Sequence, residues 1–186
     1  MRGFHISFVI GYTPYFMQYG DDYYYDGAYC LMCYFAGEAV STWFINPFAQ
    51  QHLGCQGSMI IGSLFMFLQV LPLNFLNQPM SDSELTAAVA FMYITGFLGG
   101  IGYLISWEGL IQYNLLTYKS KSLKQSDSWK YLMNLENLSL VIVMLITAFA
   151  GAYDFQAFKL LHTSVAFASF IMILILSRPV SKETKK

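Results

Sequence analysis

The residue best placed to do chemistry is Glu38, a carboxylate in the middle of an apolar, aromatic-rich stretch. A charged group at the centre of a membrane costs about 2.5–3.5 kcal/mol, so ionisable residues kept there mark proton or ion sites by default. A relay needs more than one station, and the other apolar stretches offer no second carboxylate at mid-depth. The pattern therefore favours a neutral Glu38 that hydrogen-bonds a neighbouring helix or subunit, with an intramembrane proton or ion site as the alternative.

Cysteine and histidine do not form a recognisable metal, redox or haem site. Cys30 and Cys33 make a single C-x-x-C, without the second pair or the nearby histidine that a zinc site needs. With Cys55 they are an odd number in apolar surroundings, which predicts buried thiols rather than disulfides. His162 lacks a second axial haem ligand, since His52 is predicted to lie toward the opposite side. We expect no catalytic residue, no metal and no cofactor, although bound lipids are expected.

The overall composition is that of a membrane protein. Of the 186 residues, 56% are apolar, 18% aromatic and only 11% charged. A soluble domain carries about 25% charged residues, so this chain has too little polar surface to cover a globule in water. The net charge of −1 and the lack of a basic stripe exclude nucleic acid as a partner.

Apolar windows of about 20 residues predict membrane-crossing helices. The predicted fold class is an all-α integral membrane protein, a bundle of five transmembrane helices, or four if the first does not cross. Residues 1–27 form an aromatic-rich interfacial N-terminal segment, and residues 178–186 a basic C-terminal tail. The predicted spans, which together make up the bundle over 28–177, are 28–48, 53–76, 85–105, 131–153 and 158–177.

The window 28–48 decides between five spans and four. It contains Glu38, and Pro47 is expected to terminate its helix. With four spans, the acidic cluster 21–26 would lie on the side of the membrane that holds the clustered lysines. With five spans, it lies on the opposite side, together with Asp82, Glu84 and Asp154. We therefore predict five. The tyrosines inside that cluster, Tyr23 to Tyr25, predict an interfacial collar, with a partner-docking patch as the alternative.

Basic residues gather on one predicted face. The loop 118–130 holds four lysines and the tail after Ser177 holds four more bases, and the spans put both on the same side. Asp82, Glu84 and Asp154 lie on the other side. By the positive-inside rule the basic side is cytoplasmic, or the matrix side of a mitochondrial membrane. Lys159, at the start of the last span, is expected to extend its ammonium group to the membrane surface.

Small residues predict where helices approach one another closely. Gly96 and Gly100 form a G-x-x-x-G, and Ser164 with Ala168 gives a second pair of small residues at the same spacing. Packing between the chain's own spans is enough to explain both pairs.

Two functions from different classes fit these features. The first is a non-catalytic accessory or structural subunit of a large multi-subunit complex, most plausibly of the mitochondrial inner membrane (respiratory chain or ATP synthase). It is favoured because the spans lack a connected polar pathway, and aromatic residues suit contacts with other membrane subunits and with phospholipids. The alternative is a small proton- or ion-coupled transporter or channel that uses Glu38, with Gln69, Thr95 and Thr147 as the nearest polar groups by depth.

Overall fold

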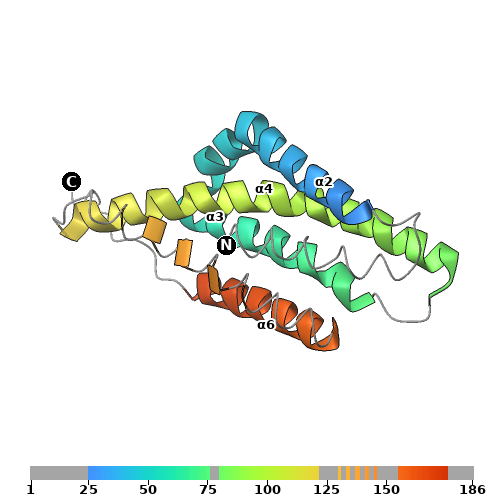
Figure 1. Cartoon of the computed structure of the whole chain (residues 1–186). Helices are drawn as coiled ribbons and strands as arrows, with labels where there is room; N and C mark the ends of the chain where they lie inside the picture. Colours follow the sequence, from blue (N-terminus) through green and yellow to red (C-terminus); the bar gives the residue numbers. More distant parts are fainter. Residues whose placement is uncertain are drawn as a thin grey trace.

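The computed structural model describes residues 25–75, 80–121 and 155–175, with isolated positions between 130 and 145. Within these ranges every regular element is helical, as the sequence predicted (Figure 1). The elements are α2 (Asp26–Val40), the π-helical turn η3 (Ser41–Ile45), α3 (Asn46–Val70), the 3₁₀ turn η4 (Leu71–Phe75), α4 (Asp82–Lys121) and α6 (Phe155–Leu174).

The long helix α4 is the element on which α2 and α3 are assembled (Figure 1). Its 40 residues correspond to about 60 Å at the usual helical rise. α2 runs in the same direction as α4, since Asp26 lies against Tyr93 and Gly37 lies further along, against Phe97. α3 runs in the opposite direction, and α6 packs on the side of α3. α3 is therefore antiparallel to α4, whereas α2 and α4 pack side by side in parallel.

Glycines set the distance between α2 and α4. A Cβ added to Gly100 would overlap the backbone carbonyl oxygen of Tyr34, and one added to Gly37 would overlap that of Phe97. Gly96 lies one turn before Gly100, 3.0 Å from the Cys30 sulfur by the same construction. The two backbones touch here, which only helices with small residues at the contact can achieve.

A second set of glycines does the same for α3 and α4. A Cβ at Gly62 would come within 2.5 Å of the Gly102 carbonyl oxygen, and the converse distance is also 2.5 Å. Further along α4, a Cβ at Gly109 would lie 2.7 Å from the Cys55 carbonyl oxygen. α4 thus contacts α2 through one set of glycines and α3 through another.

Buried aromatic and aliphatic side chains fill the space where the three helices meet. Tyr34 of α2, Met66 of α3 and Tyr103 of α4 form one cluster, with Trp107 packed against it. A second cluster joins Ala49 to Ile101 and Ile105. No side chain in these two clusters is charged.

The bend between α2 and α3 differs from the sequence prediction. Pro47 was expected to end the first helix, but it occupies the start of α3, where a missing N–H is tolerated, and the helical path continues through it. The interruption comes instead at Gly54, with φ 65° and ψ −178°. The break between the predicted spans 28–48 and 53–76 therefore lies at Gly54 and not at Pro47.

Helices α4 and α6 overlap two of the predicted spans. α4 covers the predicted span 85–105 but continues to Lys121, so the basic loop 118–130 begins inside a helix. α6 covers most of 158–177. Most of 131–153, nearly all of the N-terminal segment 1–27 and the tail 178–186 lie outside the described residues.

Two helical stretches of the described chain have the length and apolar composition to cross a membrane. They are Asp26–Val70, which includes the bend, and Asp82–Thr117. A shorter apolar helix covers Lys159–Leu174.

The Gly100 contact can be tested with one added carbon. Gly100→Ala should lower the free energy of unfolding by about 1–3 kcal/mol, because the new Cβ meets backbone that must shift. The control is Ala90→Val, which adds carbon to an exposed position of the same helix. Reversible unfolding in mild detergent measures both. Equal stability of Gly100→Ala and the wild type would show that α2 is not held at this distance.

The bend makes a separate prediction. Gly54→Ala should lower stability by about 1–3 kcal/mol through backbone strain alone, because nothing lies within 4 Å of the added Cβ and φ is positive. Gly57→Ala, three residues later and without positive φ, adds only a 3.0 Å contact with the Leu53 Cβ and should cost less stability than Gly54→Ala. If both variants behave alike, Gly54 does not adopt this conformation in solution.

Candidate functional site

Glu38 lies in the last turn of α2, at the contact with α4. The residue is half-buried, and one of its carboxylate oxygens is enclosed by protein. Its backbone nitrogen is 2.9 Å from the position of a Cβ at Gly100, and its carbonyl oxygen accepts a 2.9 Å hydrogen bond from the Thr42 hydroxyl. Glu38 also has a further interaction within the chain. The glycine contact thus holds its backbone in place.

The polar residues expected at similar depth do not form a path to Glu38. The Thr95 hydroxyl donates to carbonyl oxygens of its own helix, at 2.9 Å to Phe91 and 3.3 Å to Met92. Gln69 approaches α4 from the α3 side, where its side chain lies against Gly99. Thr147 is outside the described residues. Within the described chain, the Thr95 hydroxyl and the Gln69 amide therefore do not link Glu38 to either end of the helices.

Gln69 is the buried polar residue that the packing accommodates least well. It is 1% exposed, and neither amide atom has a hydrogen-bond partner among the described residues. A buried amide without a partner costs roughly 1–3 kcal/mol by mutational data. The fit of its side chain against Gly99 is tight, which leaves no room there for a bound molecule.

The three cysteines are free thiols in helical segments. Cys30 is buried, and its sulfur lies 3.5 Å from the Met92 carbonyl oxygen, to which the thiol donates. Cys33 and Cys55 are half-buried. No group of three or more His, Cys, Asp or Glu side chains with metal-binding geometry occurs among the described residues.

The two described histidines lie on different helices, near opposite ends of α3. The His52 ring packs against Phe48 at 4.3 Å, on the bend before Gly54. His162 is buried on α6, near the other end of α3. The residue next to it, Thr163, accepts a hydrogen bond from Asn74 of η4, the turn that follows α3. They do not face one another, so this geometry provides no pair of axial ligands for a haem.

The two pairs of small residues that were predicted to be helix contacts have different surroundings. Gly96 and Gly100 both contact α2, as described above. Ser164 and Ala168 are exposed on the outer face of α6 and do not pack against another described helix. Other residues of α6 face α3. The spacing of Ser164 and Ala168 places them on one side of the helix but does not tell which side packs against a neighbour.

Sequence reasoning missed a tyrosine cluster where α2 begins. The Tyr93 hydroxyl donates a short hydrogen bond to the Asp26 carboxylate, and the Tyr93 and Tyr29 rings meet edge to face at 6.5 Å. Tyr25 packs on Tyr29. The acidic, tyrosine-rich run signalled part of this cluster, but the partner on α4 lies 67 residues away in sequence and left no local signal.

The amide of Gln69 gives a stability prediction. Gln69→Met, which keeps the length and removes the polar atoms, should raise the free energy of unfolding by about 1–3 kcal/mol. Gln50→Met is the matched control, because the Gln50 Nε2 donates to Asn46 and to the Ile105 carbonyl oxygen and only its Oε1 has no partner, so this variant should be less stable than Gln69→Met. Chemical denaturation in detergent compares the two. Destabilisation by Gln69→Met would mean that the amide is hydrogen-bonded after all.

Comparison with known proteins adds no assignment. The chain matches no family model, no curated protein and no solved structure. The function is therefore inferred from how the described helices place their polar and apolar side chains.

Proposed function

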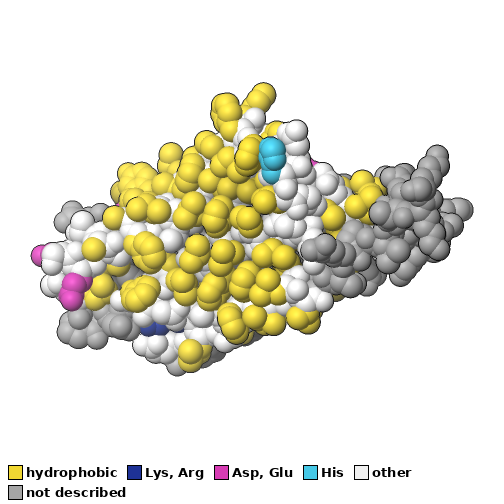
Figure 2. Space-filling view, turned by 180° about the vertical axis from the view of Figure 1, so that it is seen from behind, with side chains coloured by type: hydrophobic (Ala, Val, Ile, Leu, Met, Phe, Trp, Pro, Cys, Tyr) yellow, Lys and Arg dark blue, Asp and Glu magenta, His cyan; other side chains and the backbone are white. Residues whose placement is uncertain are grey.

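We propose that this chain is an integral multi-pass membrane protein and that it serves as a non-catalytic structural subunit of a larger membrane complex. The observation that carries the proposal is the exposure of large apolar side chains on the outer faces of the helices. Trp43 and Phe44 of η3 are 77% and 75% exposed, and Ile175, directly after the end of α6, is 77% exposed. Figure 2 shows apolar side chains gathered over the middle of one face of the molecule.

Such a surface is unlike that of a soluble monomer. Soluble proteins rarely expose contiguous apolar patches above a few hundred Å², and larger ones mark contacts with membrane or protein. The exposed apolar side chains come from every described helix, among them Met32, Phe48, Ile94, Leu160 and Met172. Surrounding lipid and neighbouring subunits would cover them together.

The length of the apolar stretch on α4 supports the membrane part of the proposal. From Leu85 to Trp107 the helix carries no charged residue, and this run is about 35 Å long. A bilayer core is about 30 Å thick, so the run would cross it with some tilt. Glu84 and Glu108 stand at its two ends.

The interior supports a structural role over transport. Backbone contacts at Gly100 and Gly62 close the interfaces that α4 makes with α2 and α3, and Tyr34, Met66 and Tyr103 fill the space between. A channel or transporter needs a polar or water-filled route at this depth. The described interfaces are closely packed at these contacts.

The partly enclosed Glu38 carboxylate favours one alternative, a proton- or ion-coupled transporter. Glu38→Gln separates the two proposals, because glutamine can hydrogen-bond but cannot exchange a proton. The structural proposal expects the variant to assemble normally and to leave the activity of the complex unchanged. Glu108→Gln, at the end of the apolar run, is the control. Loss of activity from an intact complex with Glu38→Gln alone would favour the proton role.

The principal test asks what the chain assembles with. Membranes from mitochondrial and other fractions are washed with alkaline carbonate, extracted in gentle detergent and separated on a native gel, and the band is identified by mass spectrometry. We expect the chain to stay with the membrane and to migrate with other subunits, in the mitochondrial fraction with its basic loop facing the matrix. Release by carbonate would contradict the membrane location, and migration as a small species would contradict the subunit role.

A further inference from the structure

The tyrosine cluster at the start of α2 combines exposed aromatic rings with a carboxylate. Its members are Tyr25, Asp26, Tyr29 and Tyr93. Tyr25 and Tyr29 are 60% and 50% exposed, so both rings reach the outer surface of the bundle. The Asp26 carboxylate is half-buried and accepts the hydrogen bond from the Tyr93 hydroxyl. The cluster thus presents aromatic rings and a polar group side by side.

The contacts between α2 and α4 fix the level of this cluster along α4. Long side chains on a helix point back toward its N-terminus, so the Tyr93 hydroxyl lies about one turn before its own Cα, near the level of Val89. α2 gives the same result. The thiol of Cys30, one turn beyond Asp26, donates to the Met92 carbonyl oxygen, and the two helices run in the same direction. Asp26 therefore lies nearer than Met92 to the start of α4.

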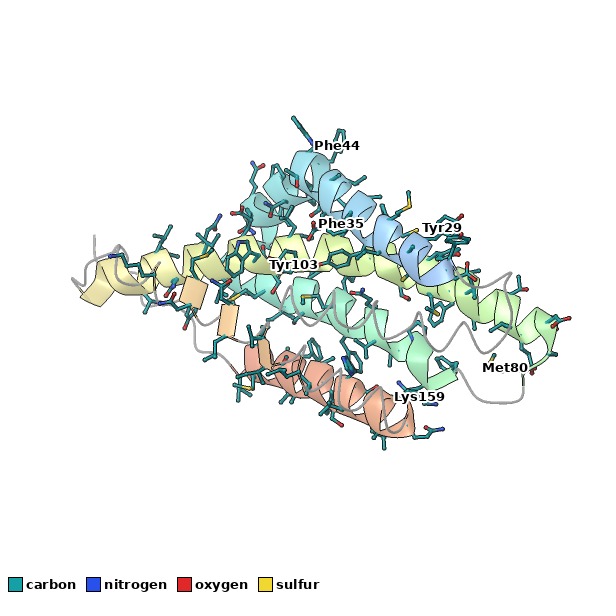
Figure 3. All side chains as sticks on the ribbon, viewed as in Figure 1. Tyr29, Phe35, Phe44, Met80, Tyr103 and Lys159 are labelled. Atoms are coloured by element: carbon teal, nitrogen blue, oxygen red, sulfur yellow. The ribbon has the colours of Figure 1, made fainter. Side chains whose placement is uncertain are left out.

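The turn η4 brings the end of α3 to a similar level. The Phe75 ring lies 6.3 Å from the Phe91 ring of α4, and the two rings are 62% and 40% exposed. Asn74, next to Phe75, is exposed as well. Figure 3 shows Tyr29 and Met80 toward the same end of the molecule. Aromatic and polar side chains from α2, α4 and η4 therefore gather around one level.

Polar side chains of the bend between α2 and α3 mark a second level. The Gln50 amide donates to the Ile105 carbonyl oxygen, and the exposed Gln51 follows it. Glu108 lies one turn further along α4. From the level of Val89 to Glu108 the helix rises about 28 Å, close to the thickness of about 30 Å of a bilayer core. The tyrosine cluster and the bend are therefore one bilayer core apart.

We propose that the tyrosine cluster is the surface through which the chain contacts the lipid headgroups on the side of Asp82 and Glu84, an inference that rests on the membrane location proposed above. Tyrosine suits this position because its ring is apolar while its hydroxyl keeps a polar partner. At this level the Asp26 carboxylate reaches the headgroup layer, whereas a carboxylate deeper in the hydrocarbon would be costly. Met32, about one turn further along α2 and 65% exposed, lies against the acyl chains.

This placement assigns each part of α4 to a layer of the bilayer. The uncharged run from Leu85 to Trp107 is longer than the core requires, and its first turn lies among the headgroups. The hydrocarbon core then begins near Val89 and ends near Glu108. α2 with the bend makes one complete crossing in the direction of α4, and the rest of α3 makes the return crossing.

The first test compares three side chains of the wild-type chain in phosphatidylcholine nanodiscs. Hydroxyl radicals generated in the water oxidise the side chains that water reaches, and mass spectrometry locates the products. We expect oxidation of Tyr25 and Tyr29 and loss of oxidation at Met32, although Met32 is the most exposed of the three within the protein and thioethers oxidise readily. Oxidation of all three would refute the membrane location. Protection of all three would refute the headgroup contact and leave the membrane location standing.

Two cysteine variants locate the same boundary on α4. Ala87 and Ile94 are both exposed and lie two turns apart on one face of the helix, so neither substitution disturbs the packing. A membrane-impermeant maleimide should modify Ala87→Cys and fail to modify Ile94→Cys in the same nanodiscs. Mass spectrometry identifies the modified residue, which keeps the native thiols apart, and circular dichroism verifies the fold.

The outcomes of the cysteine test separate the two proposals. Modification of neither variant would place the start of the run in the hydrocarbon and refute the headgroup contact. Modification of both would refute the membrane location itself. Neither test needs a partner subunit, so a chain that migrates alone on a native gel would refute the subunit role while the headgroup contact stands.

Discussion

The close approach of backbones at α4 is the constraint on which the remaining structure depends. In the membrane location proposed above, bringing two apolar helices together would yield no hydrophobic gain, so their association would rely on contact area. Gly100 admits the Tyr34 carbonyl and Gly102 admits Gly62, on two faces of one helix. With both neighbours held at this distance, large side chains such as Tyr34 and Met66 fit only where the three helices converge.

The sequence predicts the helices well because their signal is local, and predicts the joints poorly because theirs is not. Apolar runs identified α4 and α6, while Lys119 and Lys121 do not end a helix by themselves, so α4 continues beyond the predicted limit. Pro47 is compatible with ending one helix or beginning the next. Gly54 and Gly57 look equivalent in sequence, and only tertiary packing decides which of them takes a positive φ.

The candidate site residues show the same difference between local signals, which the sequence contains, and long-range contacts, which it does not reveal. Residue type was enough to single out Glu38, but its position beside Gly100 depends on which helices touch. Lys159 could be identified as a charge near a helix start, and the expected course was outward along the surface. The rotation of α6 instead buries its side chain, and this rotation is fixed by contacts such as Phe67 with Phe170, which join distant parts of the chain.

The placement of several buried hydroxyl groups bears on the choice between a structural subunit and a transporter. The buried hydroxyls of Ser63 and Thr95 donate to carbonyl oxygens of their own helices, and that of Ser41 lies 3.4 Å from the Ile101 carbonyl oxygen on α4. Groups satisfied in this way are not available to pass a proton or an ion from one to the next. A conduit would need its polar side chains to face one another across a gap, and glycine contacts that bring backbones together remove that gap. The feature that makes the described helices pack is thus the same feature that argues against transport between them.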